Sequence, residues 1–143
     1  APTFDVIFGD AFHDISVPAH LVSREFHGEV AARLRRGGFY VVNVVDAARN
    51  PRFLASLVHT LAQDFPVVEV WTQVAQPAPG ARMVFAVVAG AAPTPVDQFT
   101  APAPDLMTFG ALGDGFVQAL AQDRGMILTD DYAPIDRLMG RPD

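Results

Sequence analysis

The sequence contains no cysteine. Disulfide frameworks, thiol nucleophiles and thiolate metal sites are therefore excluded. It also contains no lysine, and its 16 acidic residues outnumber its 10 basic residues, which gives a formal net charge of -6 at pH 7. A protein that binds nucleic acid through the phosphates needs a clustered basic face. We therefore expect no nucleic-acid partner.

Long apolar runs are also missing. The longest runs, such as Met83–Ala89, are far shorter than the roughly 20 residues that a membrane helix needs. The segment Ala1–Phe8 does not have the pattern of a secretory signal peptide. We expect a soluble, cytoplasmic chain that makes no membrane contact.

The motifs of several common sites are absent as well. No G-x-S-x-G pattern surrounds any serine, which removes the usual nucleophile of acyl transfer. His20 and His27 share one predicted helix without an acidic partner pattern, and His59 is on another, so we expect no metal site. No glycine-rich turn of the G-x-G-x-x-G type follows a strand near Ala1. We expect the nucleoside-binding segment to precede Ala1 in a longer protein.

The sequence does contain alternating strand and helix patterns. Its 143 residues, half of them apolar, suffice for one domain with a sizeable core. Phe4–Phe8 is a compact apolar run that ends in Gly9 and Asp10, as a buried parallel strand does where its carboxyl end opens into a loop. Phe39–Val45 predicts a second strand that is apolar on both faces except at Asn43.

Two amphipathic helices are predicted, one between these strands and one after the second strand. The first begins at Val17-Pro18 and is stopped by the arginines and glycines of residues 35–38. The second begins with Asn50 as N-cap and Pro51 at the first helical position. The apolar positions of the two helices are Leu21, Val22, Phe26, Val30 and Leu34, and Phe53, Leu54, Leu57, Val58 and Leu61.

The later part of the chain predicts a hairpin and a short helix. Val67–Val74 and Arg82–Ala89 are strands whose connection is too short for a crossover, so they should be antiparallel. Ala91–Asp105 is predicted to be an irregular connection, and Phe116–Asp123 a short helix. Residues 1–143 therefore predict one α/β domain, the later part of a Rossmann-like sheet. It has parallel strands, right-handed crossover helices on its faces and a C-terminal antiparallel hairpin.

Candidate functional residues gather where the predicted strands end. Asp10 stands where open α/β sheets place reacting groups, although an aspartate there also serves as a helix cap or a loop residue. His13 and Asp14 follow in the same loop, so two carboxylates and an imidazole could bind one small polar ligand. Asn43 is expected to be buried and to need a partner, either a ligand or a neighbouring loop.

Two further features concern the docking of the C-terminal tail and association with other chains. The tail segment Asp130-Asp131, with Tyr132 and Pro134, predicts a turn that docks the carboxyl terminus on the sheet, in preference to a ligand site. The first strand would lie at an exposed edge of the sheet, and such an edge pairs readily with another chain. We therefore expect a homo-oligomer.

Three segments together resemble the spermidine synthase family, in particular the spermidine synthase-like proteins of bacteria. They read FDVIFGDAFHD, VPAHLVSREFHGEVAARLRRGGFYVVNVV and ILTDDYAP, and the resemblance covers most of the chain. The resemblance implies a class I methyltransferase-like fold. It also implies metal-free transfer of an aminopropyl group from decarboxylated S-adenosylmethionine to a polyamine such as putrescine. By motif, Asp10 corresponds to the aspartate that deprotonates the amine, and Asn43 to a glutamine near it.

The sequence also departs from that family. Its second aspartate comes one position late, at Asp14, and Ala78 replaces a tyrosine before the turn of the hairpin. Without the nucleoside segment, the chain alone is expected to be inactive. Two alternatives to aminopropyl transfer remain: methyl transfer from S-adenosylmethionine on the same fold, and a non-catalytic binding or assembly module.

Overall fold

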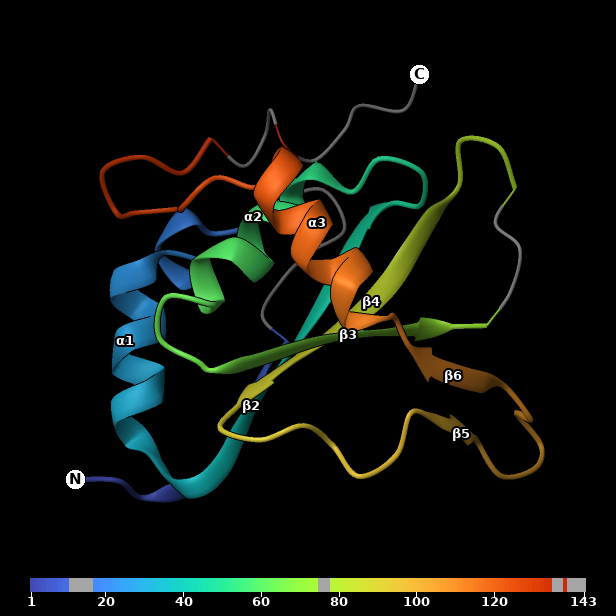
Figure 1. The fold of residues 1–143 in the computed structure, drawn as a ribbon, viewed down its shortest axis with the longest axis horizontal. Helices are drawn as coiled ribbons and strands as arrows, with labels where there is room; N and C mark the ends of the chain where they lie inside the picture. The colour runs from blue at the N-terminus through green and yellow to red at the C-terminus, as the bar shows by residue number, and fades with distance from the viewer. Residues whose placement is uncertain (11–16, 75–77, 135–137, 139–143) are drawn as a thin grey trace.

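The computed structural model describes residues 1–10, 17–74, 78–134 and 138. These residues form a six-stranded sheet, three α-helices and a 3-10 turn (Figure 1). In chain order the elements are β1 (Phe4–Gly9), η1 (Ala19–Leu21), α1 (Arg24–Arg33), β2 (Leu34–Ala47), α2 (Arg52–Leu61), β3 (Val67–Gln73), β4 (Arg82–Gly90), β5 (Gln98–Thr100), β6 (Thr108–Ala111) and α3 (Asp114–Arg124).

The strands lie in the order β1-β2-β4-β3-β6-β5. β1 and β2 are parallel and are joined through α1, whereas every other neighbouring pair is antiparallel. β4 therefore runs back between β2 and β3, which are joined through α2. Gly80, with a φ of +72°, follows Pro79 in the turn before β4, where the backbone turn requires a residue without a β-carbon. The mixed α/β fold and the antiparallel hairpin are confirmed.

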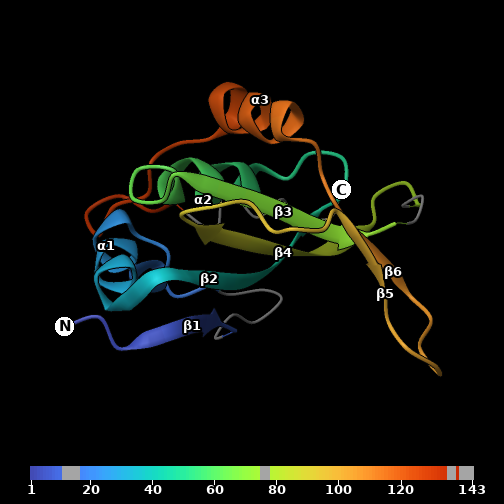
Figure 2. The same ribbon diagram turned by 60° about the horizontal axis from the view of Figure 1, so that its bottom comes forward.

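The core lies on one face of this sheet. Tyr40, Val42 and Val44 of β2 stand opposite Ala89, Val87 and Phe85 of β4, and all six are buried. They pack against buried side chains of all three helices, for example Val30, Leu57 and Val117. The sequence predicted helices on both faces, but the described helices cover only this one (Figure 2).

The opposite face of the sheet, which we call the open face, is also apolar. Phe8 of β1, Phe39 of β2 and Val84 of β4 are 74%, 41% and 59% exposed. The register places Phe39 next to Val6 of β1 and Gly90 of β4, so Phe39, Val6 and Gly90 lie on the same surface of the sheet. The alternation that sends one apolar set inward therefore leaves a second apolar set in contact with solvent.

Several predicted boundaries were wrong for local reasons. The first helix begins after Ser23, whose Oγ accepts from the Phe26 N–H at 3.2 Å, and Val17-Pro18 instead precedes a 3-10 turn. β2 begins at Leu34, because Gly37, with a φ of +81°, lets the chain bulge and still pair with β1. Asn50 does not cap α2, which begins at Arg52.

The sheet also extends further than predicted. Gln98–Thr100, expected to be part of an irregular connection, is strand β5, which pairs with β6 beyond the hairpin. Phe99 of β5 stacks on Phe109 of β6 at a ring-centroid distance of 5.2 Å and contacts Trp71 at 5.7 Å. These ring contacts stabilise strands too short to be recognised from their own sequence. The predicted short helix near residues 116–123 is confirmed as α3.

Candidate functional site

Asp10 and Asn43 lie side by side where β1 ends, Asp10 directly after β1 and Asn43 within β2, four residues before that strand ends. Gly9, the last residue of β1, stands opposite Val42 in the β1–β2 ladder, so the next residue on each strand is Asp10 and Asn43. The Asn43 Nδ2 donates a hydrogen bond to the Asp10 Oδ1 at 3.3 Å. Both side chains are exposed, so the expectation of a buried amide at Asn43 was wrong. The pair can receive a cationic or hydrogen-bonding group from solvent.

A buried tyrosine supports this strand end from the core side. A β-carbon at Gly9 would lie 2.7 Å from the Tyr40 Oη, so the close approach of this ring requires glycine at position 9. Tyr40 packs against His27 and Phe65 with ring-centroid distances of 5.8 and 6.4 Å. Burial raises the pKa of Tyr40 to about 12, so its phenol stays neutral at physiological pH. Tyr40 therefore has a packing role behind Asp10.

The other candidates are distributed differently. His13 and Asp14 lie outside the described residues. Among the described residues, no cluster of three or more histidine and acidic side chains is arranged to hold a metal ion, and no helix is long and apolar enough to cross a membrane.

The tail forms the predicted turn, but on different elements. The Thr129 and Tyr132 backbones exchange two hydrogen bonds, at 3.0 and 3.1 Å. The Asp130 N–H donates to a Glu25 carboxylate oxygen of α1 at 3.0 Å. The Leu128 N–H donates to the Thr60 Oγ1 of α2 at 2.9 Å. The tail therefore docks on α1 and α2 rather than on the sheet.

Sequence reasoning missed two buried carboxylates. Asp46 accepts hydrogen bonds from the Ala47 N–H at 2.8 Å and from the Leu54 N–H of α2 at 2.9 Å, so it caps the helix that follows β2. Burial raises the pKa of Asp46, although those hydrogen bonds and the nearby charge of Arg82 oppose the shift. An aspartate that interrupts an apolar strand just before a helix was the available signal.

Glu69 of β3 is the second buried carboxylate. It accepts hydrogen bonds from the Thr94 N–H at 2.8 Å, the Thr94 hydroxyl at 2.7 Å and the Trp71 Nε1 at 3.1 Å. Burial alone would raise its pKa, but these three bonds outweigh burial and the net shift is downward. Glu69 therefore anchors the β4–β5 connection to β3, and its acceptor oxygens are already engaged.

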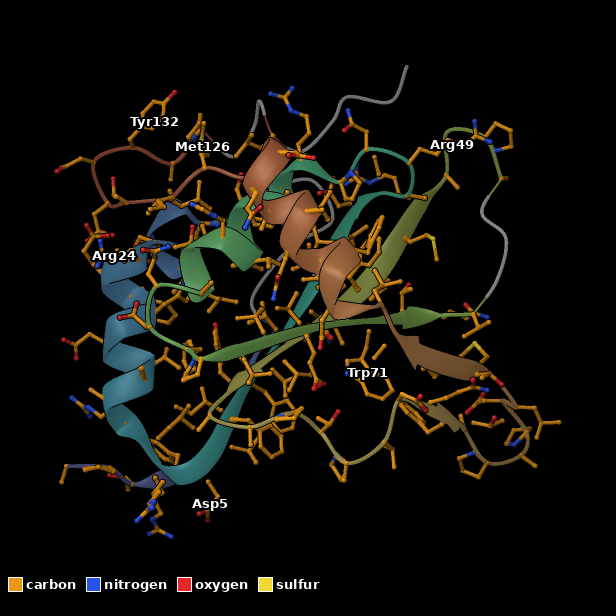
Figure 3. The ribbon with its side chains drawn as sticks, viewed as in Figure 1. Asp5, Arg24, Arg49, Trp71, Met126 and Tyr132 are labelled. Carbon is orange, nitrogen blue, oxygen red and sulfur yellow. The ribbon has the colours of Figure 1, made fainter. Side chains whose placement is uncertain are left out.

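A groove on the open face adjoins the Asp10–Asn43 pair. It has a volume of about 700 Å³, and Asn43 is part of its lining. The open face of β2, β3 and β4 forms its floor, and β5 and β6 form a wall on the side of Trp71, which Figure 3 labels near the point where β3 and β6 meet. A second cavity, of about 770 Å³, lies on the helix side, lined mainly by apolar residues of α2, α3 and the sheet. Of these two cavities, the groove on the open face is the one lined by Asn43.

Comparison with known proteins shows the fold. No protein-family model and no curated protein sequence matches the chain. A probable spermidine synthase from Corynebacterium glutamicum matches over 94% of this chain and 50% of its own, with a TM-score of 0.65 and 17% identity. Human methyltransferase-like protein 13, solved with SAH, matches over 95% of this chain and 56% of its own, with a TM-score of 0.45 and 20% identity. The chain thus spans about half the length of these structures and shares the fold of that part of the probable spermidine synthase.

Proposed function

We propose that Asp10 and Asn43 form the amine site of a spermidine synthase-like aminopropyltransferase, in which Asp10 binds and deprotonates the attacking amine. An alkylammonium group has a pKa of roughly 10, so it carries a proton at neutral pH and cannot act as a nucleophile until that proton is removed. The observation that carries the proposal is the exposed Asp10 carboxylate, held by Asn43 at 3.3 Å at the carboxyl end of β1.

The donor half of the reaction is not assigned to this chain. Decarboxylated S-adenosylmethionine would supply the aminopropyl group, but a nucleoside of this kind is usually held by a glycine-rich turn after a strand. The described residues around Asp10 do not provide such a turn. The proposal therefore concerns what Asp10 and Asn43 do to the amine: they orient it and accept its proton.

Amine binding to the purified chain tests the proposal directly. We expect calorimetry at neutral pH to detect binding of simple alkylamines, and Asp10→Asn to weaken it at least tenfold. Asp5→Asn is the matched control, because Asp5 is an exposed carboxylate on the same strand, paired with Arg35 at 3.4 Å. Equal affinity in wild type and Asp10→Asn would contradict the role of Asp10, and no amine binding at all would favour a non-catalytic assembly module.

Methyl transfer is separated from aminopropyl transfer by the donor. In a form of the protein that binds a sulfonium nucleoside, the proposal expects tighter binding of the decarboxylated donor than of S-adenosylmethionine itself. It also expects Asp10→Asn to slow transfer by on the order of a hundredfold or more, the usual contribution of a general base. Preference for the carboxylated donor would instead indicate a methyltransferase.

A further inference from the structure

We infer that the acceptor is an amine with one positive charge and an apolar body, held along the groove on the open face, and not a linear polyamine. This inference rests on the proposed role of Asp10 and adds the class of acceptor. It follows from the shape of the groove, the chemistry of its lining and the position of charge along it.

The groove has the size and shape of a small-molecule site. Its volume of about 700 Å³ lies within the usual range for such sites, roughly 300–1,000 Å³. Its floor is the open face of β2, β3 and β4, and its wall is formed by β5 and β6, so the groove is a concave surface between floor and wall. Asn43 is in its lining and holds Asp10, so a ligand whose amine reaches Asp10 continues into this groove.

Most of the lining is aromatic or aliphatic, and its polar members are Asn43, Thr72, Gln73, Arg82 and Thr94. Phe39, Ala86 and Val88 line the floor, and Phe99, Met107 and Phe109 line the wall. Phe99 and Met107 remain 51% and 41% exposed, so a ligand would cover apolar surface that water now contacts. An alkyl or aryl body gains from that burial, whereas a second ammonium group would lose its hydration there.

The distribution of charge along the groove disfavours binding of a polycation. Arg82 is part of the lining, and its guanidinium donates to the Val45 carbonyl at 3.3 Å. Asn43 stands opposite Ala86 of β4, and Arg82 begins β4 four residues earlier. At about 3.3 Å per residue, Arg82 lies about 13 Å along the strand from this pair. A cationic amine is therefore attracted at the Asp10 end, whereas the charged side chain described in the groove lining, Arg82, is itself cationic.

No second carboxylate is available to a polyamine among the described residues that line the groove. Glu69 stands opposite Val88 in the sheet, but its oxygens accept the three hydrogen bonds from Thr94 and Trp71. It is 7% exposed and outside the groove lining. A diamine would therefore place its far ammonium against aromatic side chains and near Arg82, without a counter-charge.

Calorimetry with a matched pair of amines tests this inference. We expect n-hexylamine to bind the purified chain at least tenfold more tightly than 1,6-diaminohexane, which has the same carbon chain and one more charge. Hexan-1-ol, which lacks the charge, should bind more weakly than hexylamine. Tighter or equal binding of the diamine would overturn the inference.

Two variants locate the preference in the groove. Val84→Glu places a carboxylate on an exposed lining position and should raise the affinity for the diamine at least fivefold. Phe99→Ala should weaken hexylamine binding about fivefold and leave diamine binding nearly unchanged. Unchanged selectivity in both variants would overturn the inference.

Asp10→Asn separates this inference from the proposed function. If Asp10→Asn weakens both amines but wild type prefers the diamine, the proposed amine site stands and the inferred acceptor class fails. If the variant weakens neither amine, the proposed function itself fails.

Discussion

His27 places an imidazole ring in the core with no hydrogen bond from either ring nitrogen to any described residue. Burial lowers its pKa from 6.5 to about 4. Between these values the unfolded chain binds a proton that the folded chain does not, so the free energy of unfolding falls as the pH is lowered through this range. The contribution of neutral His27 to the free energy of unfolding is therefore fully present above its ordinary pKa of 6.5, and it is lost as the pH falls toward about 4.

We predict that replacing His27 removes part of this acid sensitivity. Between about pH 7.5 and about pH 5, wild type should lose about 2 kcal/mol more stability than His27→Leu. Urea denaturation at the two pH values measures the difference. His20→Leu is the control, because His20 is exposed. Equal losses in wild type and His27→Leu would show that His27 does not titrate on unfolding.

Asp46 has the opposite sign, because its pKa is raised. The folded chain holds the Asp46 proton more tightly than the unfolded chain does, so ionisation of this group lowers stability as the pH rises through and above the ordinary value of 3.8. Its hydrogen bonds nevertheless satisfy the buried Leu54 N–H at the start of α2. Burial therefore disfavours the negative charge of Asp46, whereas the Leu54 N–H needs an Asp46 oxygen as its acceptor.

We therefore predict that the two substitutions at Asp46 differ. Asp46→Ala should lower the free energy of unfolding by about 2 kcal/mol, because a buried N–H loses its acceptor and α2 its cap. Asp46→Asn should cost less, because it keeps one acceptor oxygen. Urea denaturation measures both, with the exposed Asp123→Ala on α3 as control. A smaller loss for Asp46→Ala than for Asp46→Asn would contradict this account.

At the scale of elements, the packing of α3 depends on the glycine that ends it. A β-carbon on Gly125 would contact the Ala121 carbonyl oxygen and would lie 2.6 Å from that of Ala55 in α2 and 2.9 Å from the His59 Cβ. These are mainly backbone contacts, which cannot rotate away as a flexible side chain would. Gly115, in the first turn of α3, has open space around its β-carbon position.

We predict opposite effects for alanine at these two glycines. Gly125→Ala should destabilise the fold by about 1–3 kcal/mol, because α2 and α3 must move apart. Gly115→Ala should stabilise it by about 0.5–1 kcal/mol through helix propensity alone. Thermal and urea unfolding of the two variants test the pair. Stabilisation by both would show that α3 is not held closely against α2.

Elements with strong periodic patterns could be predicted from the sequence. β1, α2, the β3–β4 hairpin and α3 carry continuous apolar runs or a helical stripe of apolar residues, and all were located from those patterns. β5 and β6 have three and four residues and depend on the contacts of Phe99 with Trp71 and Phe109. Contacts between such distant residues leave no periodic signal.

The candidate site was predictable in part for the same reason. Asp10 was found because it ends a recognisable strand, and Asn43 because it interrupts one. Their hydrogen bond could be seen only after the β1–β2 register was known. Glu69 acts through Thr94, 25 residues away along the chain, so its role followed from the tertiary structure alone, whereas Asp46 carried a local signal, its position in a strand just before a helix.

At the scale of the whole molecule, β1 is an edge strand with an exposed aromatic residue. Phe8 is 74% exposed at that edge, and the sheet order leaves one side of β1 without a strand among the described residues. Figure 2 shows β1 at the opposite side of the fold from α3. Unpaired backbone groups beside an apolar surface favour association with another polypeptide.

We predict that the purified chain self-associates through this edge. Its mass in light scattering should rise with concentration, and Phe8→Lys should reduce that rise. Phe116→Lys is the matched control, because Phe116 is 60% exposed on α3. A mass equal to that of one chain at every concentration would rule out the association.

The central position of β4 has a consequence for the order in which the chain can fold. β2 finds its antiparallel neighbour only in residues 82–90, with Phe39 opposite Gly90 and Ala47 opposite Arg82. At ribosomal rates of about 5–20 residues per second, the nascent β2 therefore waits about 2–9 s for that partner to be synthesised. During this interval, α1, α2, β1 and Phe65 are among the neighbours that can cover its apolar side chains. The centre of the sheet therefore forms late, when β4 inserts between β2 and β3, which are both synthesised before it.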